Sequence, residues 1–248
     1  QQKRLLEKRW QVLERTRSLS IRNAVGCCYI LGELESRENY NYLLKLVGEL
    51  PIDSPVLGEL GVALGKIGDR RAIEPLEKAL EVCRKRAMAY FIAIASMSPP
   101  PPFSEEVSGK LIQGLGMLKA HSAVDTIVGI ALTQYQGVRL SKVPSYAAQV
   151  LPTLVQRENR KKIEDMIVTI LSDEAFNLTS QWHAAKSAGN MKIQPALVHL
   201  RYLLTDRRQS LTVMRAAGWA IQEITGQTPL IPQPRIRQGN WIIQKIIK

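Results

Sequence analysis

The chain has 248 residues and a formal net charge of +12, and 45% of its residues are hydrophobic but only 6% are aromatic. These totals are typical of a soluble globular chain and predict one large domain or an elongated array with an aliphatic core. The three cysteines exclude a disulfide framework and favour a reducing, cytoplasmic location, and the longest apolar run, 87–95, is too short to cross a bilayer.

Residues 1–20 predict a charged amphipathic helix with an apolar side formed by Leu5, Leu6, Trp10 and Leu13. We interpret this helix as a cap on the first repeat, and a juxtamembrane or coiled-coil connector is the alternative. The chain starts at Gln1 rather than Met, so we expect a cropped or processed product. Membrane contact is then expected only through the chain ends or through a segment upstream.

A repeated pattern follows and predicts pairs of helices. Gly32, Gly65, Gly116 and Gly189 each stand between apolar residues, and Gln222 takes the same place 33 residues after Gly189. Apolar residues recur eleven and fifteen residues beyond each of the four glycines, and this spacing of four marks one face of a second helix. In our interpretation the glycine marks the end of the first helix, and a short polar stretch turns the chain into the second.

Two irregular regions interrupt the expected array, which spans residues 21–227. Residues 98–103 include four consecutive prolines, preceded by an apolar helix at about 85–97 and followed by a helix that Ser104 can cap. A degenerate repeat is expected near 147–170, where Pro152 would kink the first helix. No β-strand is expected anywhere.

The last part of the chain, 228–248, predicts an irregular basic tail, because its prolines forbid a regular helix. The apolar residues near its end would fold back onto the last hairpin as a cap. Contact with a membrane or a partner is the alternative.

Residues 64–76 closely resemble the HEAT-like repeat of phycobilin lyases, and residues 216–226 resemble the closing helix of many bacterial HEAT arrays. The resemblance covers most of residues 20–227. A hairpin of this kind cannot bury its apolar face alone, so neighbouring hairpins must stack. The expected fold is therefore all-α: an α-solenoid, a right-handed superhelix of HEAT-like helical hairpins.

Residue types that support catalysis or metal binding are scattered. His121, His183 and His199 fall in different repeats, and neither a Cys-x-x-Cys nor a His-x-x-x-His motif occurs. Glycine-rich nucleotide loops and a serine nucleophile elbow are missing as well. We therefore expect no catalytic residue, no cofactor and no metal, although the family resemblance leaves the question of enzymatic activity open.

The resemblance implies a protein-binding scaffold, because such arrays mainly hold partner proteins. We expect another protein or peptide to bind along the second helices, which line the concave face of HEAT arrays. Candidates for contact on these helices are Tyr42, Lys45, Lys78, Arg201 and Tyr202.

Two other functions stay open on the sequence. Some similar proteins bind and attach bilin pigments, so a bilin lyase or chaperone is one alternative. A distant group acts as DNA glycosylases, so nucleic-acid binding is the other, but the basic excess lies at the two chain ends rather than along one face. Trp182 and Trp219 invite a base-stacking role, yet their positions inside repeat helices favour packing.

Overall fold

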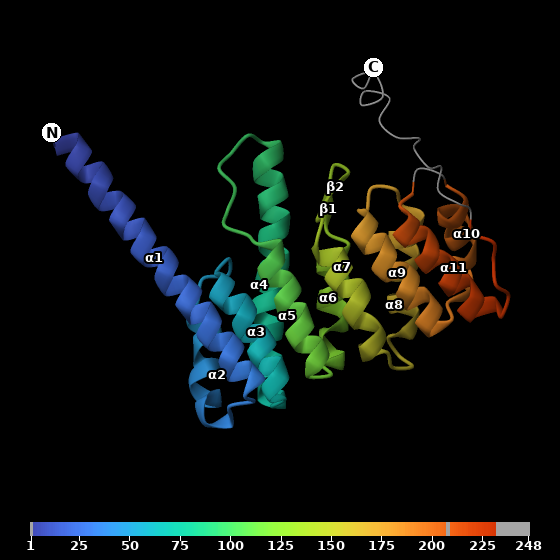
Figure 1. Cartoon of the computed structure of the whole chain (residues 1–248), viewed down its shortest axis with the longest axis horizontal. Coiled ribbons are helices and arrows are strands. Elements are labelled where there is room, and N and C mark those ends of the chain that lie inside the picture. Colours follow the sequence, from blue (N-terminus) through green and yellow to red (C-terminus); the bar gives the residue numbers. More distant parts are fainter. Residues whose placement is uncertain (1, 207–208, 232–248) are drawn as a thin grey trace, which may run out of the picture. The chain divides into compact units, whose positions relative to one another are not determined.

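The computed structural model describes residues 2–206 and 209–231, with side chains from residue 18 onwards. Within these residues the fold is built from α-helical hairpins, as Figure 1 shows. The chain forms two compact units, residues 1–166 and 167–248, and the division falls inside α8 (Arg160–Ser172).

The first unit consists of helical hairpins stacked in two layers. First helices pack in series, α1 on α3, α3 on α5 and α5 on α7, while the second helices α2, α4 and α6 pack on one another beside them. The elements are α1 (Gln2–Glu33), α2 (Tyr40–Glu49), α3 (Pro55–Ile67), α4 (Ile73–Ala95), α5 (Glu105–Met117), α6 (Val124–Ala131), β1 (Gln134–Tyr135), β2 (Val138–Arg139) and α7 (Val143–Val150).

The second unit contains α9 (Leu178–Met191), α10 (Leu197–Thr205) and α11 (Leu211–Thr225) after the end of α8. The first helices α9 and α11 pack directly on each other, and α10 packs on α11. The prediction of an all-α array of HEAT-like hairpins is confirmed, and the right-handed sense of a superhelix stays a prediction.

The anchor glycines serve helix packing rather than helix termination. Each lies inside the last turn of its first helix, where an added Cβ would meet the next first helix. At Gly65 the added atom would lie 2.8 Å from Gly114 Cα, and at Gly32 it would lie 2.8 Å from Ala63 Cα. Glycine is therefore required here because the two helix backbones approach too closely for a side chain.

Three residues after each anchor glycine, just beyond the end of the first helix, stands a residue with left-handed backbone geometry. This residue is Gly68 after α3, with φ of 79°, and Lys192 after α9, with φ of 53°. Glu35 and Lys119 take the same place after α1 and α5. A left-handed residue at this point reverses the chain and starts the turn into the second helix.

The proline-rich segment lies where the sequence predicts an interruption, but the helix before it is longer than expected. α4 continues without a break from Ile73 to Ala95, so the helix expected at 85–97 is the end of α4. α5 begins after Ser104, whose Oγ accepts a hydrogen bond from Val107 N at 3.3 Å, and this cap confirms the prediction.

A short β-hairpin in the first unit contradicts the prediction that no strand occurs. β1 and β2 are antiparallel and joined by Gln136 and Gly137, which both have positive φ. Two such residues form the tight turn that matches the twist of a two-stranded hairpin. The strands have two residues each and leave the stack of α5 and α7 in place.

The chain ends and the degenerate repeat differ in detail from the predictions. α1 runs unbroken through residue 20, so the boundary expected there has no counterpart in the structure. α7 ends at Val150, and Pro152 lies in the 3-10 turn that follows instead of kinking a helix. The apolar side expected in 1–17 and the tail beyond residue 231 lie outside the described side chains.

No helix among the described residues combines the length and the apolar character that crossing a membrane requires.

Candidate binding groove between α9 and α11

The five residues predicted to contact a partner are all exposed on second helices. Tyr42 and Lys45 lie on α2 and Lys78 on α4, whereas Arg201 and Tyr202 lie on α10 in the other unit. The polar groups of three of them are already engaged: Lys45 Nζ lies 3.4 Å from Glu49, Lys78 Nζ lies 2.6 Å from Glu74, and Tyr202 Oη donates to Glu174 at 2.8 Å. A shared binding face made by these residues stays a prediction.

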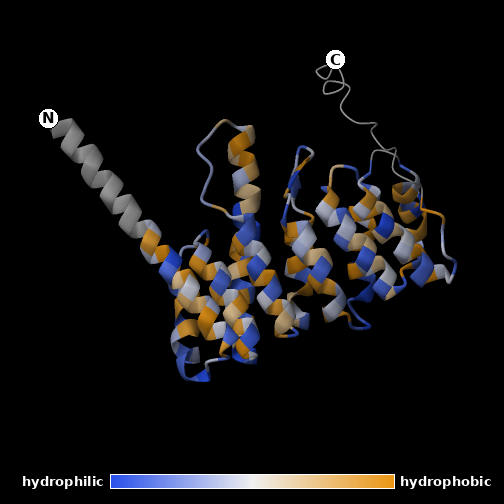
Figure 2. Cartoon of the chain, viewed as in Figure 1, coloured by the Kyte–Doolittle hydropathy of each residue, from blue (hydrophilic) through white to orange (hydrophobic). Residues whose placement is uncertain are grey.

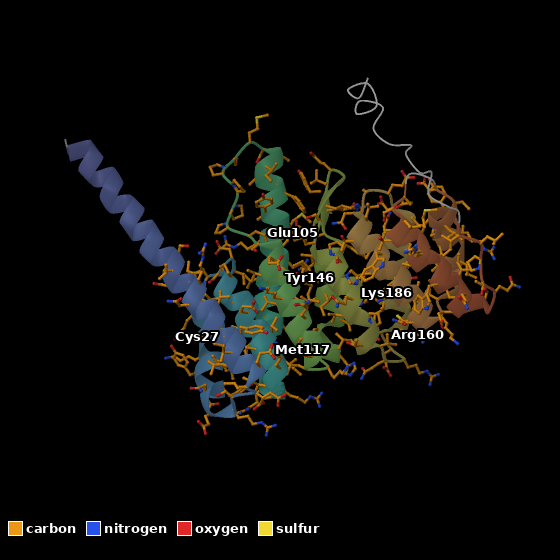
Figure 3. All side chains as sticks on the ribbon, viewed as in Figure 1. Cys27, Glu105, Met117, Tyr146, Arg160 and Lys186 are labelled. Carbon is orange, nitrogen blue, oxygen red and sulfur yellow. The ribbon has the colours of Figure 1, made fainter. Side chains whose placement is uncertain are left out.

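A groove on the second unit offers side chains of a different kind. One cavity of about 620 Å³ and a neighbouring cavity of about 320 Å³ lie along α9 and α11 and share Trp182 and Thr212. The larger is lined by Trp182, Lys186, Asn190, Thr212, Arg215, Ala216 and Trp219. The smaller adds Leu178, Thr179, Ser210 and Val213. Figure 3 labels Lys186 on α9.

The repeat places these side chains opposite one another across the groove. Thr179, Trp182 and Lys186 follow the i, i+3, i+7 spacing that defines one helix face. Their equivalents on α11, each one repeat later, are Thr212, Arg215 and Trp219. Every residue of these two sets lines the groove. Each helix thus contributes one tryptophan and one cation, in opposite order along the chain.

Trp182 explains why a groove forms between this pair of helices. It stands seven residues before the anchor glycine of α9, and the same position in α3 is the buried Gly58. An added Cβ at Gly58 would lie 3.3 Å from Val107 Cα, so α3 and α5 are closely packed at that level. An indole ring cannot fit into that spacing, so α9 and α11 must leave room beside Trp182.

Trp219 closes the other end of the groove. An added Cβ at Gly189 would lie 2.6 Å from Cζ3 of the Trp219 ring, so this glycine lets the indole lie across α9. The residue is 36% exposed, so the packing expected from its position in a repeat helix is partial and leaves one side of the indole accessible. A half-buried tryptophan held against a helix is a preorganised surface for a ligand, because ordering it costs little further entropy.

The described side chains that line the groove include two cations and no acidic group. Lys186 Nζ lies 4.8 Å from the centroid of the Trp182 ring, where it gains a cation–π contact. Neither Lys186 nor Arg215 makes an ion pair with the side chains that the structure describes. Burial, followed by the charge of Lys186, lowers the pKa of His183, whose ring stacks edge-on against Trp182. His183 is therefore neutral at pH 7.

The side chains that could support catalysis or metal binding are not gathered at this groove. Among the described residues, no cluster of three or more His, Cys, Asp or Glu side chains has the arrangement of a metal site. His121 links two turns, the one after α5 and the 3-10 turn after α7, with Nδ1 3.0 Å from Leu154 O. Burial raises the pKa of the Cys83 thiol to about 11, so this thiol stays protonated and is a poor nucleophile.

Comparison with known protein families agrees with the arrangement of the hairpins. The family model of the PBS lyase HEAT-like repeat matches residues 56–81, which cover most of α3 and the start of α4. The matched segment of this chain is a HEAT-like repeat. No curated protein matches its sequence significantly. The match therefore identifies the repeat of this HEAT-like protein but does not name a ligand.

Proposed function

We propose that this HEAT-like protein is a non-enzymatic scaffold that binds an acidic segment of another protein in the groove between α9 and α11. The observation that carries the proposal is the pairing of two tryptophans with two cations around a groove that no acidic residue lines. Tryptophan and arginine supply most of the binding energy at many protein interfaces, which makes this lining favourable for a partner.

The size of the groove fits a short extended peptide. From Leu178 to Asn190, α9 rises by about 18 Å at 1.5 Å per residue. An extended chain covers that length with five or six residues at about 3.3 Å each. Acidic side chains of such a segment would face Lys186 and Arg215, and its apolar or aromatic side chains would contact the two indole rings.

The structure supports this groove more strongly than the second-helix face that the sequence favours. Lys45 and Lys78 each lie beside a glutamate on the same helix, so little net positive charge remains at these two points of the second-helix face. The groove instead combines shape, aromatic surface and unpaired charge in one place.

Single-stranded nucleic acid is the competing ligand, because cations interleaved with aromatic rings also suit phosphates and bases. Two observations favour a peptide: the described lining of the groove offers two cations, and Leu178, Val213 and Ala216 add aliphatic surface that bases do not require. Binding through phosphates would also weaken steeply with added salt.

A peptide-display selection on the full chain tests the proposal. We expect enriched peptides to combine Asp or Glu with aromatic or aliphatic residues, and soluble copies to compete with one another for one site. An oligothymidylate should bind more weakly than these peptides at physiological salt. Enrichment of basic or uncharged peptides, or tighter binding of the oligonucleotide, would contradict the proposal.

A further inference from the structure

The end of α4 forms an apolar projection that the hairpin stack does not cover. α4 is much longer than its partner second helices, and its last turns extend past the stack together with the proline-rich loop (Figure 1). Figure 2 shows this end as strongly hydrophobic. No charged residue occurs between Arg86 and Glu105.

Part of the projection packs internally and fixes its shape. Phe91 is buried, and the Tyr90 ring lies 5.9 Å from the Phe103 ring at the return of the loop. The β-hairpin also contacts α4 and points in the same direction, with Val138 exposed. The projection is therefore an ordered feature of the first unit.

The remaining apolar side chains are exposed on more than one side of the helix. Met88 and Ile92 are four residues apart and share one face, whereas Ile94 lies on another, and all three are exposed. Met97, just beyond the helix end, is 97% exposed. A protein groove would cover one face of a helix, but an apolar medium that surrounds the tip would cover all of them.

Basic residues stand at the base of this projection. Lys85 and Arg86 are exposed and directly precede the uncharged segment. Arg86 makes no ion pair with the described residues. From Arg86 to Ala95 the helix rises by about 14 Å. The two acidic residues after the uncharged segment already have partners. Glu105 accepts a hydrogen bond from the backbone N–H of Lys142, and Glu106 forms an ion pair with the Lys142 side chain.

We propose that this projection, residues 85–103 with the neighbouring β-hairpin, docks on the surface of an anionic lipid bilayer. The apolar tip would enter the boundary between headgroups and acyl chains, while Lys85 and Arg86 would lie at the level of the lipid phosphates. The net charge of +12 favours approach to such a surface. This proposal is independent of the peptide groove, which lies in the other unit.

A fluorophore at the tip tests the docking. The full chain is prepared as Met97→Cys with the exposed native thiol removed by Cys27→Ser, since Cys28 and Cys83 are buried. With an environment-sensitive label, we expect a blue shift and a several-fold rise in emission on adding phosphatidylcholine vesicles that contain phosphatidylserine. The same label at Glu38→Cys, between α1 and α2, should not respond.

Matched variants separate tip insertion from attraction by the basic chain ends. Ile92→Gln with Ile94→Gln should reduce the vesicle-bound fraction about tenfold, because two apolar side chains no longer enter the lipid. Tyr42→Gln with Val198→Gln removes two exposed side chains elsewhere and should leave binding unchanged. Four results would each overturn the proposal. The first two are binding to vesicles without an emission change of the Met97→Cys label, and an equal decrease of the bound fraction in both double variants. The other two are an emission change in the absence of vesicles, and no binding to vesicles at all.

Discussion

Replacing Gly65 by alanine is expected to lower the free energy of unfolding of the full chain by about 3 kcal/mol. The added methyl would lie 2.8 Å from Gly114 Cα and 2.9 Å from Gly114 O, so it meets backbone atoms that cannot turn away. α3 and α5 would have to separate, and the contacts along their seam would weaken. Gly65→Asp should cost more, because it adds an unpaired buried carboxylate.

Gly48→Ala is the matched control for this effect. Gly48 also lies within a helix, α2, but nothing stands within 4 Å of an added Cβ. The same substitution should therefore raise stability by about 0.5–1 kcal/mol through the better helix propensity of alanine. Urea denaturation followed by circular dichroism measures both. Equal effects of the two substitutions would show that close helix approach does not determine the role of the anchor glycines.

Reversing the two groove charges with Lys186→Glu and Arg215→Glu is expected to weaken binding of a selected acidic peptide by about 100-fold or more. Each substitution removes an attraction and adds a repulsion at the point where the peptide carboxylates would lie. Both side chains are exposed, so the unfolding midpoint should change little. Fluorescence titration with the labelled peptide gives the two dissociation constants.

Lys45→Glu with Lys78→Glu is the control for net charge, because it changes the formal charge by the same amount on the second-helix face. We expect the dissociation constant of this variant to stay within about threefold of the wild type. If instead this variant loses affinity and the groove variant keeps it, the concave face that the sequence favours is the binding site.

The hairpin fold could be predicted from the sequence because its cause is local and repeated. Glycine and apolar residues recur at fixed offsets, and their spacing defines helix faces that only stacking can bury. The role of the anchor glycines was harder to infer, since Gly65 lies only three residues from Gly68, the residue that ends the helix. Only the distance between two helices distinguishes a packing glycine from a capping one.

The sequence analysis predicts neither the full length of α4 nor the β-hairpin. For α4 the sequence contains a misleading signal, whereas for the hairpin the usual signals are absent. Arg84, Lys85 and Arg86 are typical of a helix end, but alanines on both sides allow α4 to continue through them. The turn at Gln136 and Gly137 lacks the Asn-Gly pair that usually signals a hairpin, and the strands are too short to show alternation.

The groove was missed because its openness depends on the spacing of α9 and α11. Aligning the two helices at the repeat period would have revealed that Trp182 and Arg215 are equivalent, as are Lys186 and Trp219. The sequence alone still favours burial of tryptophans inside repeat helices. The contrast between Trp182 and Gly58 at one repeat position is the signal that distinguishes this pair of helices from α3 and α5.

Site-specific photo-crosslinking tests most directly whether a partner segment binds in the groove. A photoreactive residue replaces Thr212 in the groove of one full-chain variant and Lys78 on the second-helix face of another. With a selected acidic peptide, the Thr212 variant should form a crosslink that excess unlabelled peptide abolishes, and the Lys78 variant should form none. A crosslink from the Lys78 position alone would contradict the assignment of the groove as the binding site.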